Sequence, residues 1–281
     1  MIKIVTDSTC DLPPEWIDRY RITIVPVNIL FGLQSFQEGI DLDPLTFYQR
    51  IQASGQLPTT AQPSIGQFRE VYGRLTADRS RVLSIHLSSQ LSGTWQSARL
   101  AALEFNGRVL SFDSRSGSVG LGLMVREAAE LVEAGWPLER LIPHLEQRRR
   151  QLNVFILLKD LRYARMSGRV GRMRETLASI LQVKPIVAVV AGSLSLVEQV
   201  RGQKQGVARM IALANEALGN TPVHFAVAHA LESDLAAYVL AEAQASLNCR
   251  DTFVTELATS IAVHFGPGTV GFATYPAEII S

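Results

Sequence analysis

Cysteine and net charge are both scarce in this 281-residue chain. Cys10 and Cys249 are the only cysteines, too few for a disulfide framework and without the paired spacing of a zinc site. The histidines likewise lack a metal-ligand spacing such as H-E-x-x-H. A formal net charge of +1 excludes an overall basic field that would draw the chain onto nucleic acid. We therefore expect no structural disulfide, no metal and no nucleic acid partner.

Long apolar runs are also missing. No stretch approaches the roughly 18 residues of a membrane-spanning helix without a charge or a turn signal, so we expect no stable membrane insertion. Residues 1–7 have the pattern of a strand and lack the basic and apolar regions of a signal peptide. Together with the scarcity of cysteine, this pattern predicts a cytoplasmic protein in a reducing compartment.

The composition that is present supports a large core. Hydrophobic residues make up 47% of the chain and charged residues 19%, which argues against disorder. In the first half, β-rich runs at residues 2–5, 22–30, 82–87 and 109–112 alternate with helical patterns at 44–54, 65–75, 93–105 and 118–134. This alternation is typical of βαβ units around a parallel sheet.

The second half predicts a different kind of sheet. Strand-like runs at 186–190 and 194–200 flank a Gly192-Ser193 turn and predict a hairpin. Strands at 223–229, 251–256 and 269–274 alternate with helices at 203–218 and 233–246, and a hairpin among helix-linked strands implies a mixed sheet. We therefore expect an α/β protein with an N-terminal parallel-sheet three-layer domain, residues 1–152, and a C-terminal mixed-sheet α/β domain, residues 153–281.

The strongest local signal is the stretch Ser88-Ser89-Gln90-Leu91-Ser92-Gly93-Thr94, which follows a predicted strand. Its hydroxyls can donate to an anion, Gly93 lets a ligand approach the backbone, and the next helix adds the positive end of its dipole. Polar loops beginning at Asp7 and Asp113 would meet it at one sheet edge. Capping of the helix by Ser92 or Thr94 explains the same residues. A carboxylate site, a phosphate site and a plain helix cap all stay open at this point.

Three other segments are candidates for function. Thr59-Thr60-Ala61-Gln62-Pro63-Ser64 precedes a predicted helix, and by itself it is a helix start with Ser64 as the N-cap. His264-Phe265-Gly266-Pro267-Gly268-Thr269 predicts a tight loop beside a histidine, which is either structural or a donor to a carboxylate. The arginine-rich and glycine-rich residues 162–172 predict an exposed basic turn that is solvated or fits phosphate or an acidic partner.

Taken in order, these motifs resemble the DegV family, the fatty-acid-binding subunits of bacterial fatty acid kinase. The resemblance covers nearly the whole chain and begins with Val5-Thr6-Asp7-Ser8-Thr9-Cys10-Asp11-Leu12. It continues through residues 60–64 and 88–98, Asp113-Ser114 with Gly120-Leu121-Gly122, residues 161–170, Lys184-Pro185 and Val200-Arg201-Gly202 to the loop at 264–268. It implies one long-chain fatty acid in a buried tunnel between two domains, with no cofactor besides this ligand. It also implies a place in bacterial phospholipid metabolism.

The resemblance assigns roles to individual residues. Thr60 and Ser92 would hydrogen-bond the fatty acid carboxylate, helped by the backbone amide of Gly93, and His264 would lie beside it. A separate ATP-binding kinase subunit would phosphorylate the carboxyl group, so the chain itself is expected to be a non-catalytic subunit. Arg169, with Arg165 nearby, would help to dock that partner.

Three departures from the family pattern concern these roles. Ala61 stands where serine is usual and removes a possible hydroxyl, Gln90 stands where glycine is usual, and Met166-Ser167 replaces lysine and glycine near the partner surface. A second hypothesis is a serine hydrolase that uses Ser92, His264 and either Asp7 or Asp113. The chain has no G-x-S-x-G elbow, so we favour the fatty acid carrier.

Overall fold

The computed structural model describes residues 1–159, 161–168 and 183–277. Contacts divide the chain into two compact units. Unit 1 contains Met1–Arg149 and Ala258–Val263, and unit 2 contains Arg150–Leu257 and the residues from His264 onward. A parallel sheet in unit 1 and a mixed sheet in unit 2 confirm the predicted fold class. A domain boundary between residues 152 and 153 stays a prediction.

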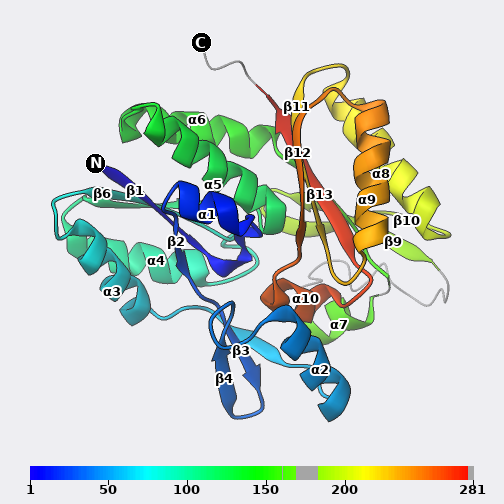
Figure 1. Ribbon diagram of the computed structural model, residues 1–281, viewed down its shortest axis with the longest axis horizontal. Coiled ribbons are helices and arrows are strands. Elements are labelled where there is room, and N and C mark those ends of the chain that lie inside the picture. Colours follow the sequence, from blue (N-terminus) through cyan, green and yellow to red (C-terminus); the bar gives the residue numbers. More distant parts are fainter. Residues whose placement is uncertain (160, 169–182, 278–281) are drawn as a thin grey trace. The chain divides into compact units, whose positions relative to one another are not determined.

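Unit 1 is built on a four-stranded parallel sheet with the strand order β2-β1-β6-β7. Its strands are β1 (Ile2–Asp7), β2 (Thr23–Val25), β6 (Arg81–His86) and β7 (Val109–Asp113). Helices α3 (Ile65–Thr76) and α4 (Thr94–Ala102) cover one face, and α5 (Ser118–Glu133) and α6 (Leu138–Gln151) cover the other (Figure 1). Because both faces are covered, Val5, Leu83 and Ile85 of the inner strands have no exposed surface.

Polar residues cap two helices of unit 1, and one of them, Ser64, is the N-cap that the sequence predicts. Ser64 begins α3: its Oγ accepts from the Gln67 amide at 3.2 Å, and the Gln67 side chain accepts from the Ser64 amide at 2.8 Å. This reciprocal cap satisfies two amides that the first turn of the helix leaves without a partner. Asp43 caps α2 (Pro44–Ser54) by accepting from the Thr46 amide. Unit 1 also contains a short helix, α1 (Pro14–Arg19), two 3₁₀ turns, η1 (Ser8–Cys10) and η2 (Leu103–Phe105), and most of α10 (Thr259–Phe265).

Unit 1 also contains a three-stranded antiparallel sheet that the sequence does not predict. Its strands are β3 (Asn28–Phe31), β4 (Gln34–Gln37) and β5 (Thr59–Ala61), in the order β4-β3-β5. The prediction of one strand over residues 22–30 is therefore wrong. β2 ends at Val25, because Pro26 cannot donate a ladder hydrogen bond, and the chain then enters the other sheet. β5 is too short to produce a periodic pattern, yet it carries Thr60.

Unit 2 is built on a six-stranded mixed sheet with the order β10-β9-β8-β13-β11-β12. Its strands are β8 (Asn153–Leu157), β9 (Lys184–Val190), β10 (Ser193–Val200), β11 (Val223–His229), β12 (Cys249–Glu256) and β13 (Val270–Pro276). β9 and β10 form the predicted hairpin. Its turn residues Ala191 and Gly192 have φ values of 51° and 88°, as the common two-residue hairpin turn requires.

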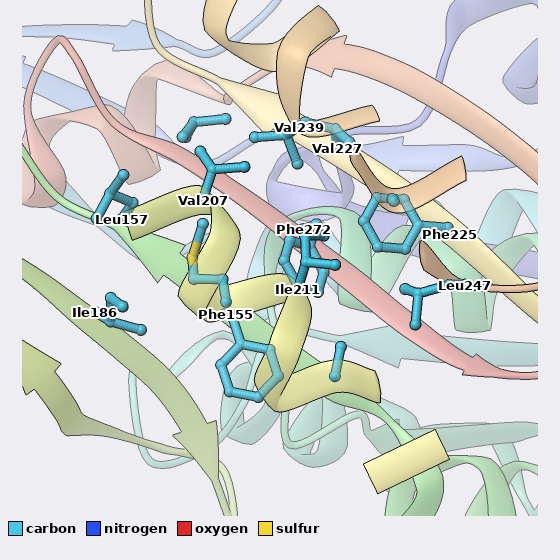
Figure 2. Packing of buried hydrophobic residues seen from close by; sticks show 14 of the residues in the cluster. Phe155, Leu157, Ile186, Val207, Ile211, Phe225, Val227, Val239, Leu247 and Phe272 are labelled. Carbon is cyan, nitrogen blue, oxygen red and sulfur yellow. The ribbon is translucent and has the colours of Figure 1, made fainter. Parts of the chain in front are cut away.

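Helices α8 (Gln203–Leu218) and α9 (Ser233–Ser246) pack on one face of this sheet and enclose the core of unit 2 (Figure 1). Figure 2 shows Phe225 of β11 and Phe272 of β13 within that core, and their stacked rings have centroids 4.7 Å apart. Gly206 lets α8 approach β8, because a Cβ at this position would lie 2.5 Å from a methyl carbon of Leu157. The apolar residues of α8, α9 and the sheet therefore pack into one continuous core.

Candidate functional site

Three polar loops meet at the carboxyl edge of the parallel sheet in unit 1, as the sequence predicts. The Leu87 amide after β6 donates to Asp7 at the end of β1, with an N–O distance of 3.0 Å. The Ser88 amide donates to the carbonyl oxygen of Ser116, in the loop after β7, at 2.8 Å. The three loops meet because β1, β6 and β7 are neighbouring strands that run in the same direction. Their contacts fix the start of the stretch Ser88–Thr94.

Two of the four hydroxyls in this stretch, those of Ser88 and Ser89, form hydrogen bonds within the polar loops. Ser89 Oγ donates to the Asp113 carboxylate at 2.6 Å, and the Ser89 amide donates to the other oxygen of the same group at 3.2 Å. Ser88 Oγ accepts from the Gln90 amide at 3.2 Å. The Ser89 hydroxyl thus donates its proton within the polar loops, and Ser92 and Gly93 are the residues of the stretch that lie at the start of α4. The anion site itself stays a prediction.

Ser92 and Gly93 form the turn that leads into α4. Gly93 is the N-cap residue, with φ of −76°, and because glycine has no side chain it makes no side-chain cap. Ser92 Oγ accepts from the Thr94 amide at 3.3 Å and lies 2.9 Å from Thr94 Oγ1. Thr94 is fully buried and Ser92 is half-buried. The Ser92 hydroxyl therefore lies at the positive end of a helix dipole, where a carboxylate is stabilised.

Gln62 brings the strand that carries Thr60 to this turn. Thr60 lies in β5 opposite the fully buried Ile29 of β3. Two residues later, the Gln62 side chain donates from Nε2 to Ser97 Oγ of α4 at 2.9 Å. The same amide group lies so close to Gly93 that a Cβ there would be 1.9 Å from Gln62 Oε1. Position 93 therefore requires glycine because the Gln62 side chain occupies the space of a Cβ atom. The sequence alone does not reveal this reason.

A buried hydrogen-bond chain lies directly behind the loop. Tyr72 donates to Ser84 Oγ at 2.8 Å, Ser84 Oγ lies 2.6 Å from His86 Nε2, and His86 Nδ1 lies 2.9 Å from Asp7 Oδ2. With Tyr72 and Ser84 as donors, His86 carries its proton on Nδ1 and donates it to Asp7. Asp7, Ser84 and His86 have no exposed surface. This serine, histidine and aspartate therefore stiffen the end of β6 and have no access to a substrate.

The electrostatics of Asp7 agree with a structural role. Burial raises the pKa of this carboxyl group, but the hydrogen bonds from His86, Thr9 and the Leu87 amide lower the pKa below its ordinary value. Asp113 is engaged by Ser89 and by the Arg115 amide. Both aspartates of the hydrolase hypothesis thus have partners in the loops of unit 1, and Asp7 already orients a histidine other than His264.

His264 lies near the end of α10 (Thr259–Phe265) and is followed by the predicted glycine loop. Gly266 and Gly268 have φ values of 78° and 86°, which disfavour any residue with a side chain. A Cβ at Gly266 would lie 2.3 Å from the Tyr163 ring, and one at Gly268 would lie 2.5 Å from Lys159. The special loop predicted from the two glycines is confirmed. Of the predicted carboxylate ligands, Thr60, Ser92 and Gly93 belong to unit 1 and His264 to unit 2.

Two buried acids contact the start of α10: Asp11, which lies in the first motif of the family resemblance, and Glu38, which lies outside its motifs. Glu38 accepts from Thr259 Oγ1 at 2.8 Å, from the Ser260 amide at 2.6 Å and from Ser260 Oγ at 2.7 Å. Asp11 accepts from the Ala258 amide at 2.8 Å. Burial raises the pKa of both carboxyl groups, against the lowering effect of these hydrogen bonds. Their separation in sequence from residue 258 explains why no local pattern predicts the contact.

The predicted partner-docking residues fall in and after a short helix of unit 2. Arg165 is exposed on α7 (Arg162–Ser167), and its amide donates to the Leu161 carbonyl oxygen. Arg169 lies outside the described residues. The basic turn expected over residues 162–172 is therefore described only up to residue 168, where Gly168 ends α7 with φ of 74°.

Over residues 1–159, 161–168 and 183–277, no helix combines the length and apolar character needed to cross a membrane. In these ranges, no group of three or more histidine, cysteine, aspartate or glutamate side chains is arranged to hold a metal ion.

The two sheets and the polar loop cluster define an α/β protein with a candidate anion site at the carboxyl edge of its parallel sheet. The DegV family model matches residues 1–277 of the chain. A DegV domain-containing protein of Deinococcus radiodurans is 37% identical over 279 residues, which are 98% of each chain. Protein DegV of Bacillus subtilis is 32% identical over 96% of this chain and 97% of its own length. The chain belongs to the DegV family.

Solved structures extend the comparison. A DegV family protein from Thermus thermophilus described as binding fatty acid superposes with a TM-score of 0.94 at 33% identity, over 98% of this chain and 99% of its own. DegV of Bacillus subtilis, described as a fatty acid binding protein, gives a TM-score of 0.89 at 30% identity, with the same coverage of each chain. Structural neighbours of this chain are therefore fatty-acid-binding members of its family.

Proposed function

We propose that this chain binds one long-chain fatty acid and presents its carboxyl group to a separate ATP-binding kinase subunit in the cytoplasm. In this proposal the carboxylate is held by Thr60, Ser92 and the backbone amide of Gly93, with His264 beside it. The observation that supports it best is the contact of Gln62 with Gly93 and Ser97. This contact brings β5, with Thr60, to the turn that carries Ser92 at the start of α4.

The chemistry of these groups suits a carboxylate. Hydroxyl and amide donors at a helix N-terminus stabilise a negative charge that would be very costly in an apolar environment without partners. Each hydrogen bond to a charged group contributes about 1.5–3 kcal/mol. The acyl chain contributes about 0.8 kcal/mol for each buried methylene group. A long chain therefore supplies affinity, and the polar loop selects the free acid; the position of the acyl chain between the domains stays a prediction.

The kinase partner follows from the family resemblance. An exposed arginine on α7, Arg165, fits an acidic partner surface. Arg169 would belong to the same docking surface. In this proposal the chain contributes no catalytic residue, and the acyl phosphate forms on the partner. Arg165→Ala and Arg169→Ala should then leave fatty acid binding unchanged and slow phosphorylation by the kinase subunit.

Thermal denaturation of delipidated protein with palmitate or oleate tests the binding step. We expect both fatty acids to raise the midpoint, because a ligand that binds only the folded state stabilises it. Methyl palmitate, which keeps the chain and loses the charge, should raise it less. No shift with either acid would refute the proposal.

Variants of the polar loop test the carboxylate site. Ser92→Ala and Thr60→Ala should each weaken binding about tenfold or more, since each removes one hydrogen bond to a charged group. Thr60→Ser keeps the hydroxyl and should retain most of the affinity. Ser54→Ala is a matched control, because Ser54 lies on α2 and its hydroxyl bonds the Arg50 carbonyl oxygen. Equal affinity for the fatty acid in Ser92→Ala, Thr60→Ala and Ser54→Ala would show that the carboxylate does not bind at this loop.

A further inference from the structure

The start of α10 is held by acids from two distant parts of unit 1. Glu38 follows β4, and Asp11 follows η1, with φ of 45° in the left-handed region. Glu38 Oε1 accepts from Thr259 Oγ1 and the Ser260 amide, and Oε2 accepts from Ser260 Oγ and Ser8 Oγ. Four donors thus surround one carboxylate, a number that a carboxylate accepts and an amide side chain does not.

Asp11 repeats the arrangement one residue earlier in the segment. Its Oδ1 accepts from the Ala258 amide at 2.8 Å, and its Oδ2 accepts from Ser118 Oγ at the start of α5. Ser8 Oγ, the fourth donor to Glu38, accepts from the Val27 amide at 2.9 Å. Hydrogen bonds therefore connect Ala258–Ser260, directly or through Asp11 and Glu38, to three segments of unit 1: the loop after β1, the end of β4 and the start of α5.

Glu38, Asp11 and the first residues of α10 are buried, so loss of their hydrogen bonds would destabilise the protein strongly. Glu38 and Asp11 are each 7% exposed, and Thr259 and Ser260 are each 3% exposed. Among the described residues, neither acid forms an ion pair with a lysine, arginine or histidine side chain. A buried carboxylate without a cation depends on its hydrogen-bond donors, and here those donors come from Ser8, Ser118 and Ala258–Ser260.

We propose that Glu38 and Asp11 are positioning residues for His264. They fix the first turn of α10, and His264 lies on the next turn of the same helix, four residues after Ser260. Because successive turns of an α-helix have a fixed geometry, holding the first turn of α10 sets where the His264 backbone lies relative to Thr259 and Ser260. This inference rests on the proposed function, in which His264 lies beside the fatty acid carboxylate.

The experiment compares Glu38→Ala with Glu38→Gln in the full chain. The two readouts are the affinity for palmitate and the NMR signal of the His264 ring carbon with its pH titration, assigned with His264→Asn. Glu38→Ala should shift the His264 signal and its titration midpoint and weaken palmitate binding about tenfold or more. Glu38→Gln, which keeps one acceptor oxygen, should fall between Glu38→Ala and the wild type in both readouts.

Glu127→Gln is the matched control. Glu127 is also a buried acid of unit 1, 5% exposed, and it bonds His144 and Arg148 on α6. It should lower the midpoint of thermal unfolding without changing the His264 signal or the affinity. If Glu38→Ala does not fold, Thr259→Val and Ser260→Ala remove single donors to Glu38 and should change the same two readouts, each by a smaller amount.

Several results would overturn the inference, and they are distinguishable from a failure of the proposed function. An unchanged His264 signal in folded Glu38→Ala, or in both Thr259→Val and Ser260→Ala, overturns it. Weakened binding in Ser92→Ala with full affinity in Glu38→Ala overturns it and leaves the proposed function standing. If the wild type itself does not bind palmitate, the proposed function fails, and the role of the acids in a carboxylate site falls with it.

Discussion

The contact between Gln62 and Gly93 supports a quantitative prediction about how β5 is joined to the loop that carries Ser92. A Cβ at Gly93 would lie 1.9 Å from Gln62 Oε1 and 2.6 Å from its Cδ, so Gly93→Ala must displace the Gln62 side chain. The φ of −76° at Gly93 is accessible to alanine, and backbone strain is therefore not the cause. Alanine is a poorer N-cap than glycine by about 0.5–1 kcal/mol, but it reduces the entropy of the unfolded chain by about 0.4–1 kcal/mol.

Because those two contributions nearly cancel, the contact with Gln62 determines the result. Displacing Gln62 breaks its hydrogen bond to Ser97, which contributes about 0.5–1.5 kcal/mol, and adds the cost of the close contact. We expect Gly93→Ala to lower the free energy of unfolding by about 1–2 kcal/mol. Gln62→Ala alone should cost about 1 kcal/mol. In the Gln62→Ala background, Gly93→Ala should cost about 0.5 kcal/mol or less, since the contact no longer exists.

Urea unfolding of the four proteins of this double-mutant cycle measures the coupling. Gly73→Ala is the matched control, because Gly73 lies in α3 and a Cβ there would meet no atom within 4 Å. In that exposed helical position alanine should stabilise the protein by about 0.5–1 kcal/mol, with or without Gln62. Additivity of Gly93→Ala and Gln62→Ala to within about 0.5 kcal/mol would refute the contact.

Two further predictions concern stability. The pKa of Glu38 is raised above its ordinary value of 4.5, so the folded state binds more protons than the unfolded chain as the pH rises from there, and stability falls. Glu38→Gln should flatten this fall in urea unfolding above about pH 4.5; a slope equal to that of the wild type would contradict the assignment. Gly266→Ala should cost at least about 2 kcal/mol, from a positive φ and the Tyr163 ring. Gly39→Ala, with a positive φ and open space, should cost only about 1–2 kcal/mol, and equal losses would exclude the ring contact.

Local pattern was sufficient to predict most of the fold. The helices α2, α8 and α9 have the predicted bounds, and the convergence of three loops at one sheet edge follows from the parallel order of β1, β6 and β7. The small sheet was missed, because Pro26 divides a continuous apolar run and β5 has only three residues. Strand length and apolar runs do not reveal which sheet a short strand joins.

The candidate site was predicted in part, for a physical reason. Ser92, Gly93 and Ser64 lie in local motifs, so hydroxyl density and capping rules find them. Gln62, His86 and Glu38 act through partners far away in sequence, and their role depends on burial that a sequence does not display. The ordinary φ of Gly93 and its contact with Gln62 are visible only in the structure, so a glycine before a helix does not by itself indicate Gln62.

Mass spectrometry of the lipid extracted from protein purified under native conditions tests the central claim most directly, because it identifies the ligand and the class of protein together. The proposed function predicts a long-chain free fatty acid at about one molecule per chain, reduced or absent in Ser92→Ala and present in Ser54→Ala. A phosphorylated ligand, or no fatty acid in protein that also fails to bind added palmitate, would contradict it.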